Sequence, residues 1–134
     1  MLTSPAWCFV GSESDLPPHY LDSSAGRLAY DDTGGTGPLV IAVPRMGDLR
    51  REYRYLTPVL KTAGYRVVTV DIRGFGETSA KWSDYSAHAV GSDLLRLATH
   101  LGQTKDIFIG NSFAAGAPLW QHMTLQNAQP RWCC

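Results

Sequence analysis

The run DIFIGNSFAAGA, from Asp106 to Ala117, joins an apolar segment of strand length to a series of small residues. This order is typical of a nucleophile elbow, a sharp strand-to-helix turn that holds a serine in a strained conformation with its hydroxyl exposed. Only small residues fit two positions before and after that serine, and Gly110 and Ala114 hold those positions around Ser112. A buried strand that ends in small residues is also common in α/β proteins, so the pattern alone leaves both interpretations open.

The composition limits the class of protein. The 134 residues are 44% hydrophobic and 18% charged with a net charge of zero, which predicts one globular domain and no nucleic-acid partner. No apolar run is long enough to cross a bilayer, so we expect no membrane association. Cys8, Cys133 and Cys134 form no disulfide framework, and no metal-binding spacing occurs. We therefore expect a cytoplasmic protein without a cofactor or metal.

Apolar runs indicate the strands. Three runs lack polar alternation and suit parallel strands buried on both faces: residues 39–43, 67–70 and 107–109. Residues 20–22 and 27–31 are predicted to pair as a hairpin. The strands that lie between helical patterns predict a doubly wound α/β sheet with right-handed crossovers.

Apolar residues at helical spacing predict helices over about 56–63 and 87–101, each closed by a glycine. Pro58 fits best near the first turn of the former helix, so we expect an irregular turn over residues 49–57 before it. The glycines of residues 33–38 do not form a phosphate-binding loop, because no Gly-Lys-Ser/Thr follows them.

Three loops leave the predicted sheet at the carboxyl ends of its strands, where the sites of such folds lie. They are residues 44–48, residues 71–79 and the turn at Ser112. The second loop carries the most specific pattern, Asp71-x-Arg73-Gly74-x-Gly76-x-Thr78-Ser79.

From about Tyr20 to Ala117 the sequence resembles the N-terminal half of an α/β-hydrolase. Its second loop is similar to the Asp-x-x-Gly-x-Gly-x-Ser loop of that family, and it stands in the expected order before a helix and the elbow. The resemblance implies the N-terminal part of an α/β-hydrolase fold. That part is a mostly parallel sheet with helices on both faces, incomplete beyond the elbow.

The resemblance assigns Ser112 as the nucleophile and the backbone N–H groups of Phe113 and Met46 as oxyanion donors. A serine argues against the branch with an aspartate nucleophile, such as haloalkane dehalogenases and epoxide hydrolases. It favours esterase, lipase-like, carbon–carbon bond or amide hydrolysis, in which the serine attacks the carbonyl of an ester, an amide or a similar small-molecule acyl substrate and forms an acyl-enzyme. Arg45 departs from the family pattern, in which glycine is usual, and its Cβ restricts the backbone there.

Asp71 has an alternative interpretation, because a carboxylate at a strand end can hold a ribose hydroxyl in a dinucleotide fold. That fold needs a glycine-rich turn upstream, and the sequence does not supply one. We therefore expect Asp71 and Arg73 to brace their loop, with Gly74 and Gly76 providing backbone freedom.

The residues after Ser112 lose the family's character. The family places an acid and then a histidine after the nucleophile, but no Asp or Glu follows Ser112, and His122 is the only later histidine. His88 and His100 lie in a predicted helix and are expected to be solvated, and Pro118 would interrupt the helix after the elbow. The chain divides into a loose leader (1–18), a partial hydrolase domain (19–117) and an atypical tail (118–134).

Two classes of function follow. The first is a serine hydrolase, active in a full-length parent and inactive in this truncated chain. The second is a non-catalytic fragment or interaction protein derived from a hydrolase. Without the family's later strands, the edge of residues 107–109 would be exposed, which predicts self-association through that edge.

Overall fold

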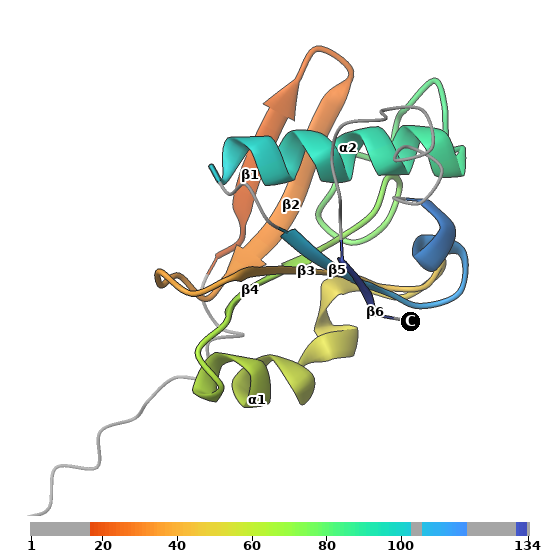
Figure 1. Ribbon diagram of the computed structural model, residues 1–134. Coiled ribbons are helices and arrows are strands. Elements are labelled where there is room, and N and C mark those ends of the chain that lie inside the picture. Colours follow the sequence, from red (N-terminus) through yellow and green to blue (C-terminus); the bar gives the residue numbers. More distant parts are fainter. Residues whose placement is uncertain (1–16, 103–105, 118–130, 134) are drawn as a thin grey trace, which may run out of the picture.

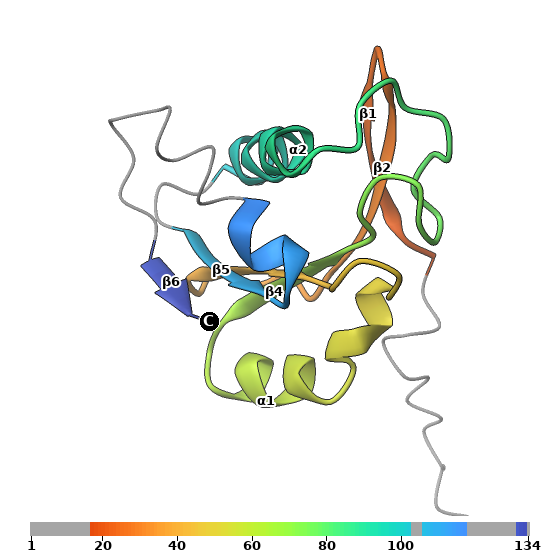
Figure 2. The same ribbon diagram turned by 90° about the vertical axis from the view of Figure 1, so that its right-hand side faces the viewer.

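The computed structural model describes residues 17–102, 106–117 and 131–133, which form a mixed six-stranded sheet in the order β1-β2-β4-β3-β5-β6. Helix α2 (Ala87–His100) lies on one face of the sheet. Helix α1 (Leu56–Thr62) and the 3-10 helix η2 (Arg50–Tyr53) lie on the other face (Figures 1 and 2). Nearly all of the predicted leader lies outside the described residues, as do Pro118 and His122 of the predicted tail.

The centre of the sheet is parallel. Strand β3 (Leu39–Val43) pairs in parallel with β4 (Arg66–Val70) on one side and with β5 (Asp106–Gly110) on the other. All five residues of β3 are buried, because helices cover both faces of the sheet, and this explains the run without polar alternation. The three strands confirm the predicted parallel core.

The hairpin predicted near the start of the chain is formed by β1 (His19–Ser23) and β2 (Gly26–Asp32). Strand β2 extends the sheet by pairing antiparallel with β4, which makes the sheet mixed. Ser23 fixes the turn, since its Oγ accepts a hydrogen bond from the Gly26 N–H at 3.1 Å.

Helix α2 is amphipathic and packs on the sheet through Val90, Leu94 and Leu97, which are buried in the main core. It begins at Ser86, whose Oγ accepts a hydrogen bond from the Ala89 N–H at 3.2 Å, and ends before Gly102 at φ 73°. These bounds agree with the predicted helix.

Helix α1 also forms where the sequence predicts it, and η2 occupies the predicted irregular turn. None of the residues of α1 is buried, however, and Val59 keeps 64% of its surface exposed. Helix α1 therefore packs on the sheet only partly, with Leu60 half-buried and Leu56 and Val59 exposed in the described part of the chain.

The edge of β5 differs from the prediction. Strand β6 (Arg131–Cys133) pairs in parallel with Ile107–Ile109, so this edge is not exposed. A short segment of the predicted tail thus takes the place that the missing strands were expected to leave open, because an unpaired row of backbone groups gains hydrogen bonds from any strand within reach.

Candidate functional site

Ser112 has the backbone conformation that an elbow requires. Its φ is +58°, and no other non-glycine residue of the described chain has a positive φ. The serine is exposed, and its hydroxyl has no hydrogen-bond partner among the described residues. Residues 113–117 are helical and directly follow it, with the Ala115 N–H donating to the Ser112 carbonyl at 3.0 Å. The strand, turn and helix therefore have the predicted arrangement.

The small residues around Ser112 are required by contact. A Cβ added to Gly110 would stand 2.9 Å from the carbonyl carbon and oxygen of Ala114, which are backbone atoms that cannot yield. Ala114 itself is completely buried. The helix therefore packs so closely on the end of β5 that a larger residue at either position would force the two apart.

The loop after β3 lies beside the elbow, because Val43 pairs with Gly110 in the parallel register. This loop forms a turn closed by a hydrogen bond from the Asp48 N–H to the Arg45 carbonyl at 3.1 Å, with Gly47 at φ 91°. Arg45 has no positive φ, so its side chain causes no strain, and the glycine that the turn needs stands two residues later. Met46 is 55% exposed at the tip.

Two backbone donors at this edge are free. The N–H groups of Met46 and Phe113 donate to no acceptor in the described part of the chain. Phe113 stands at the first position of its helix, where the N–H has no intrahelical acceptor. Free N–H groups beside an exposed hydroxyl are what an oxyanion site needs.

Helix η2, on the same face of the sheet as α1 (Figure 1), is hydrogen-bonded to the loop after β3 and to the elbow. The sequence analysis did not identify this role. Tyr53 is buried and donates its hydroxyl to the Val43 carbonyl at 2.8 Å, directly before the loop after β3. Burial, together with the nearby Glu52 carboxylate, raises the pKa of Tyr53 to about 12, so the phenol stays a donor. Glu52 contacts both the loop after β3 and the elbow, with hydrogen bonds to Arg45 and Asn111.

Arg50 of η2 is buried among three carboxylates. It contacts Asp71 through both its backbone N–H and its guanidinium, and it binds Asp31 at 2.8 Å and Glu77 at 2.9 Å. Burial by itself lowers the pKa of Arg50, but Glu77, Asp71 and Asp31 outweigh it and raise that pKa above its ordinary value. Local sequence does not signal this cluster, since charges around residue 50 look like an exposed turn.

Asp71 braces the loop after β4, as the sequence predicts. The carboxylate of Asp71 is fully buried and accepts a hydrogen bond from the Glu77 N–H at 3.2 Å. The backbone carbonyl of Asp71 accepts a hydrogen bond from the Thr78 hydroxyl at 2.7 Å. Gly76 lies against it at φ 55°, and a Cβ there would stand 2.3 Å from the carboxylate. Arg73 contributes from the other side by a two-bonded ion pair with Asp93.

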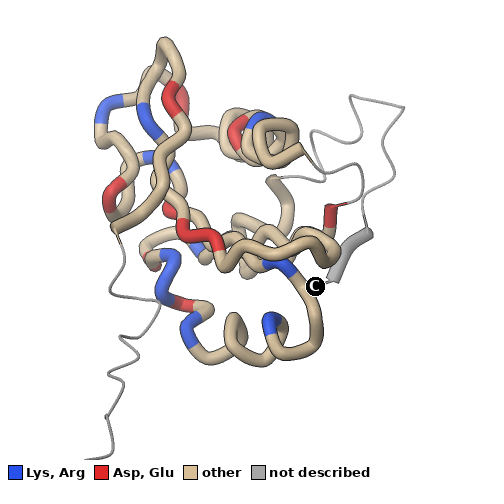
Figure 3. The backbone as a smooth tube through the Cα atoms, turned by 90° about the vertical axis from the view of Figure 1, so that its left-hand side faces the viewer, with Lys and Arg blue, Asp and Glu red and all other residues tan. Residues whose placement is uncertain are grey.

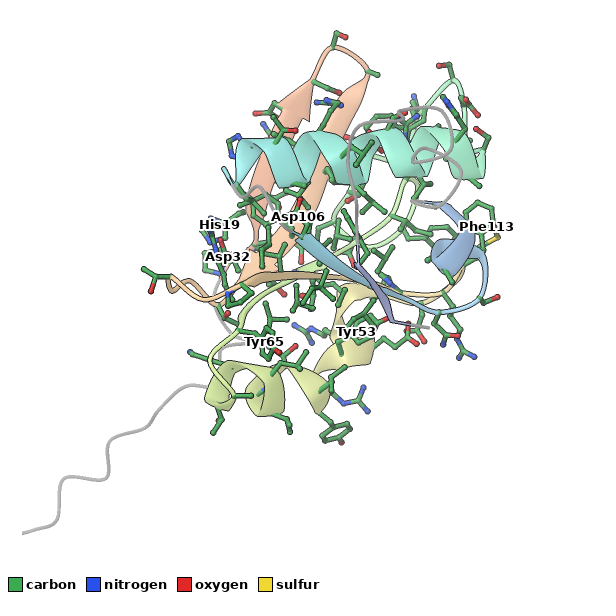
Figure 4. The ribbon with its side chains drawn as sticks, viewed as in Figure 1. His19, Asp32, Tyr53, Tyr65, Asp106 and Phe113 are labelled. Carbon is green, nitrogen blue, oxygen red and sulfur yellow. The ribbon has the colours of Figure 1, made fainter. Side chains whose placement is uncertain are left out.

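Ser112 has no hydrogen-bonded base in the described chain. Figure 4 shows His19 and Phe113 on opposite sides of the molecule, and four strand spacings of about 4.8 Å separate β1 from β5. His88 and His100 are exposed on α2. The structure therefore places the loop that carries Met46 beside the Ser112 elbow, and no described histidine is hydrogen-bonded to Ser112.

The described residues give less support for a metal site, a membrane-spanning helix or a charged binding surface. The described residues hold no group of three His, Cys, Asp or Glu side chains that could bind a metal, and no described helix is long and apolar enough to span a membrane. Figure 3 shows basic and acidic residues interspersed along the described chain. A cavity of about 420 Å³ lies beside η2 and α1, lined in part by Arg51, Arg54 and Tyr55, but no residue of the elbow reaches it.

Comparisons with known proteins agree with this architecture. The family described as alpha/beta hydrolase fold matches residues 37–120, more than half of the chain. Bifunctional epoxide hydrolase 2 from Sus scrofa is 33% identical over an alignment of 118 residues, which covers 78% of this chain and 21% of that protein. A Synechocystis sp. protein named for non-heme chloroperoxidase activity is 36% identical over 97 residues, which are 71% of this chain and 34% of that protein.

Solved structures match as well. A hydrolase from Pseudomonas aeruginosa PA01 superimposes with a TM-score of 0.77 at 26% identity, over 86% of this chain and 44% of that one. Together with the elbow, these matches show that the chain belongs to the α/β-hydrolase fold family. The chain spans about a fifth to a third of the length of the curated relatives it matches.

Proposed function

We propose that Ser112 is the nucleophile of a serine hydrolase that acts on an ester, an amide or a similar carbonyl substrate through an acyl-enzyme. The observation that carries the proposal is the exposed, unpartnered hydroxyl of Ser112 on a backbone at φ +58°. A strained conformation of this kind persists where the surrounding structure enforces it, and it is concentrated at active sites. In this proposal the N–H groups of Phe113 and Met46 stabilise the oxyanion.

The names of the relatives cover more than one reaction, epoxide hydrolysis and chloroperoxidation among them. The proposed chemistry therefore rests on the residue at the elbow. A serine hydroxyl that attacks a carbonyl forms an ester that water can then cleave, which suits acyl transfer. The attack needs a base, and no described histidine is hydrogen-bonded to Ser112, so we expect negligible turnover from this chain by itself.

A serine-directed fluorophosphonate probe tests the proposal without a natural substrate. Oxyanion donors and binding alone retain part of a hydrolase's rate acceleration when the base is lost, about 10³- to 10⁴-fold over water. We expect slow labelling at Ser112 that added imidazole accelerates by acting as the missing base. Labelling should vanish in Ser112→Ala and persist in Ser24→Ala, since Ser24 is an exposed serine in the β1–β2 turn. Labelling of Ser112 no faster than that of Ser24 would contradict the proposal.

The second candidate is a non-catalytic fragment that acts by binding another protein. Exposed apolar side chains at α1 favour it, since Val59 of the helix is 64% exposed and Tyr55, directly before the helix, is 75% exposed. The same labelling separates the two candidates, because a binding role gives no reason for a reactive Ser112. A Val59→Glu variant that abolishes capture of a partner while leaving the labelling unchanged would support the binding role.

A further inference from the structure

Glu52 of η2 bridges the two loops that carry the proposed chemistry. Its Oε2 accepts a hydrogen bond from the backbone N–H of Arg45 at 3.0 Å, and its Oε1 accepts one from the Asn111 side-chain amide at 2.9 Å. Arg45 directly precedes Met46, and Asn111 directly precedes Ser112. One carboxylate therefore holds the residue before the proposed donor and the residue before the proposed nucleophile.

The bridge stands on a fixed base. Tyr53 is hydrogen-bonded to the Val43 carbonyl at 2.8 Å, and the Arg50 N–H is bonded to the buried Asp71 carboxylate at 2.7 Å. Glu52 lies between these two anchored residues and is only partly exposed. Because η2 is anchored, the two hydrogen bonds of Glu52 fix the positions of both loops relative to the 3-10 helix.

We infer that Glu52 is a positioning residue that sets the Met46 loop against the Ser112 elbow. The inference rests on the proposed function for its effect on a rate, because the Met46 N–H stabilises an oxyanion only when it lies at hydrogen-bond distance from the oxygen of the carbonyl group that Ser112 attacks. A misplacement of about 1 Å in such an arrangement can reduce a rate by about 100-fold. Glu52 touches no reacting atom, so its effect is entirely geometric.

Two substitutions separate geometry from charge. Glu52→Ala removes both hydrogen bonds. Glu52→Gln keeps them without the charge, because its carbonyl oxygen accepts from Arg45 and its NH₂ donates to Asn111 once that amide has turned by about 180°. Glu77→Ala is the matched control, since Glu77 also binds η2, through Arg50, but its side chain contacts neither Arg45 nor Asn111.

The labelling rate of Ser112 in the full chain is the first measurement. We expect Glu52→Ala to slow labelling roughly 10- to 100-fold, while Glu52→Gln and Glu77→Ala retain most of the wild-type rate. Asn111→Asp should also slow it, by setting two carboxylates face to face, and adding Glu52→Gln to that variant should restore it. Equal rates in Glu52→Ala and the wild type, or equal losses in the Ala and Gln variants, would overturn the inference.

A second measurement decides the inference if wild-type Ser112 does not react, in which case the proposed function fails. Amide hydrogen exchange at Arg45 and the carbon chemical shifts of Ser112, which report its positive φ, are followed by NMR. In Glu52→Ala, exchange at Arg45 should accelerate and the Ser112 shifts should move toward ordinary backbone values, while Glu52→Gln should match the wild type. Unchanged exchange and shifts in Glu52→Ala would refute the positioning role.

Discussion

Ser112 is held in a conformation that costs an L-residue roughly 1–2 kcal/mol and glycine almost nothing. We therefore predict that Ser112→Gly raises the free energy of unfolding by up to about 1 kcal/mol relative to Ser112→Ala, since both variants lack the hydroxyl and only alanine keeps the strain. Urea unfolding followed by circular dichroism measures the difference. A glycine variant less stable than the alanine variant would mean that the backbone at residue 112 is not strained in solution.

Gly76 is constrained both by its backbone and by its neighbour. At φ 55° a Cβ would be strained, and it would stand 2.3 Å from the Asp71 carboxylate. We expect Gly76→Ala to destabilise the chain by about 2–5 kcal/mol, from about 1–2 kcal/mol of backbone strain and about 1–3 kcal/mol of overpacking. Gly102→Ala is the control, because Gly102 has φ 73° with no atom of the described residues within 4 Å of its added Cβ, and should show only the strain. Equal losses in thermal unfolding would rule out the clash.

At the scale of elements, η2 connects the ends of three strands. Tyr53 bonds to the end of β3, Arg50 to Asp71 at the end of β4, and Glu52 to Asn111 at the end of β5. Four residues of 3-10 helix thereby fix the edge of the sheet that carries the candidate site. This arrangement explains why a short, charged segment contains two buried side chains, Arg50 and Tyr53.

Loss of Arg50 should uncouple this element from the sheet. Asp71 is fully buried, and Arg50→Ala would leave its charge without a cation, which typically costs about 3–5 kcal/mol. Arg50→Lys keeps the charge but cannot reach three carboxylates at once, so we expect an intermediate loss. Arg51→Ala, at an exposed neighbour, should change stability by no more than about 0.5 kcal/mol. Denaturant unfolding of the three variants checks the order, and a fully stable Arg50→Ala would contradict it.

At the scale of the whole molecule, an ion pair between β2 and β4 makes stability depend on pH. Burial raises the pKa of Asp32, but hydrogen bonds from the Arg66 guanidinium and the Gly34 N–H outweigh it and lower that pKa below its ordinary value. A lowered folded-state pKa gives stability that is complete above the unfolded value of about 3.9 and is lost as the pH falls through the folded value. Asp32→Asn should therefore be less stable than the wild type at pH 7, with the difference shrinking below about pH 4. Urea titrations across this range measure it, and a constant difference would exclude Asp32 as the titrating group.

The pairing of β6 with β5 determines whether β5 or the short strand β6 forms the edge of the described sheet on that side. The double variant Trp132→Pro/Cys133→Pro disrupts this pairing, because alternate residues of an edge strand direct their N–H toward the neighbouring strand, so one of the two prolines removes an N–H that faces β5. We predict that it releases the edge of Ile107–Ile109 and increases self-association, the behaviour expected from the sequence for an open edge. Light scattering after size-exclusion chromatography gives the molar mass. A molar mass no larger than that of the wild type would show that β6 does not protect this edge.

The sequence by itself determined the elements and the elbow. The apolar runs of β3, β4 and β5, the periodicity of α2 and the glycines that close both helices are local patterns, because each reflects burial or backbone conformation within a few residues of chain. The positive φ of Ser112 was predictable for the same reason, from the small residues two positions away. The bracing role of Asp71 followed from its motif.

Tertiary structure alone decided what holds these elements together. Arg50 meets Asp31, Asp71 and Glu77, and Glu52 meets Asn111 59 residues further along the chain, through contacts between segments far apart in sequence. The same is true of β6, which pairs with the edge that was expected to be open. A charged residue in a turn looks the same whether it faces water or a buried carboxylate. Its partner is set by the packing of distant strands, because burial and pairing depend on three-dimensional neighbours that no local pattern encodes.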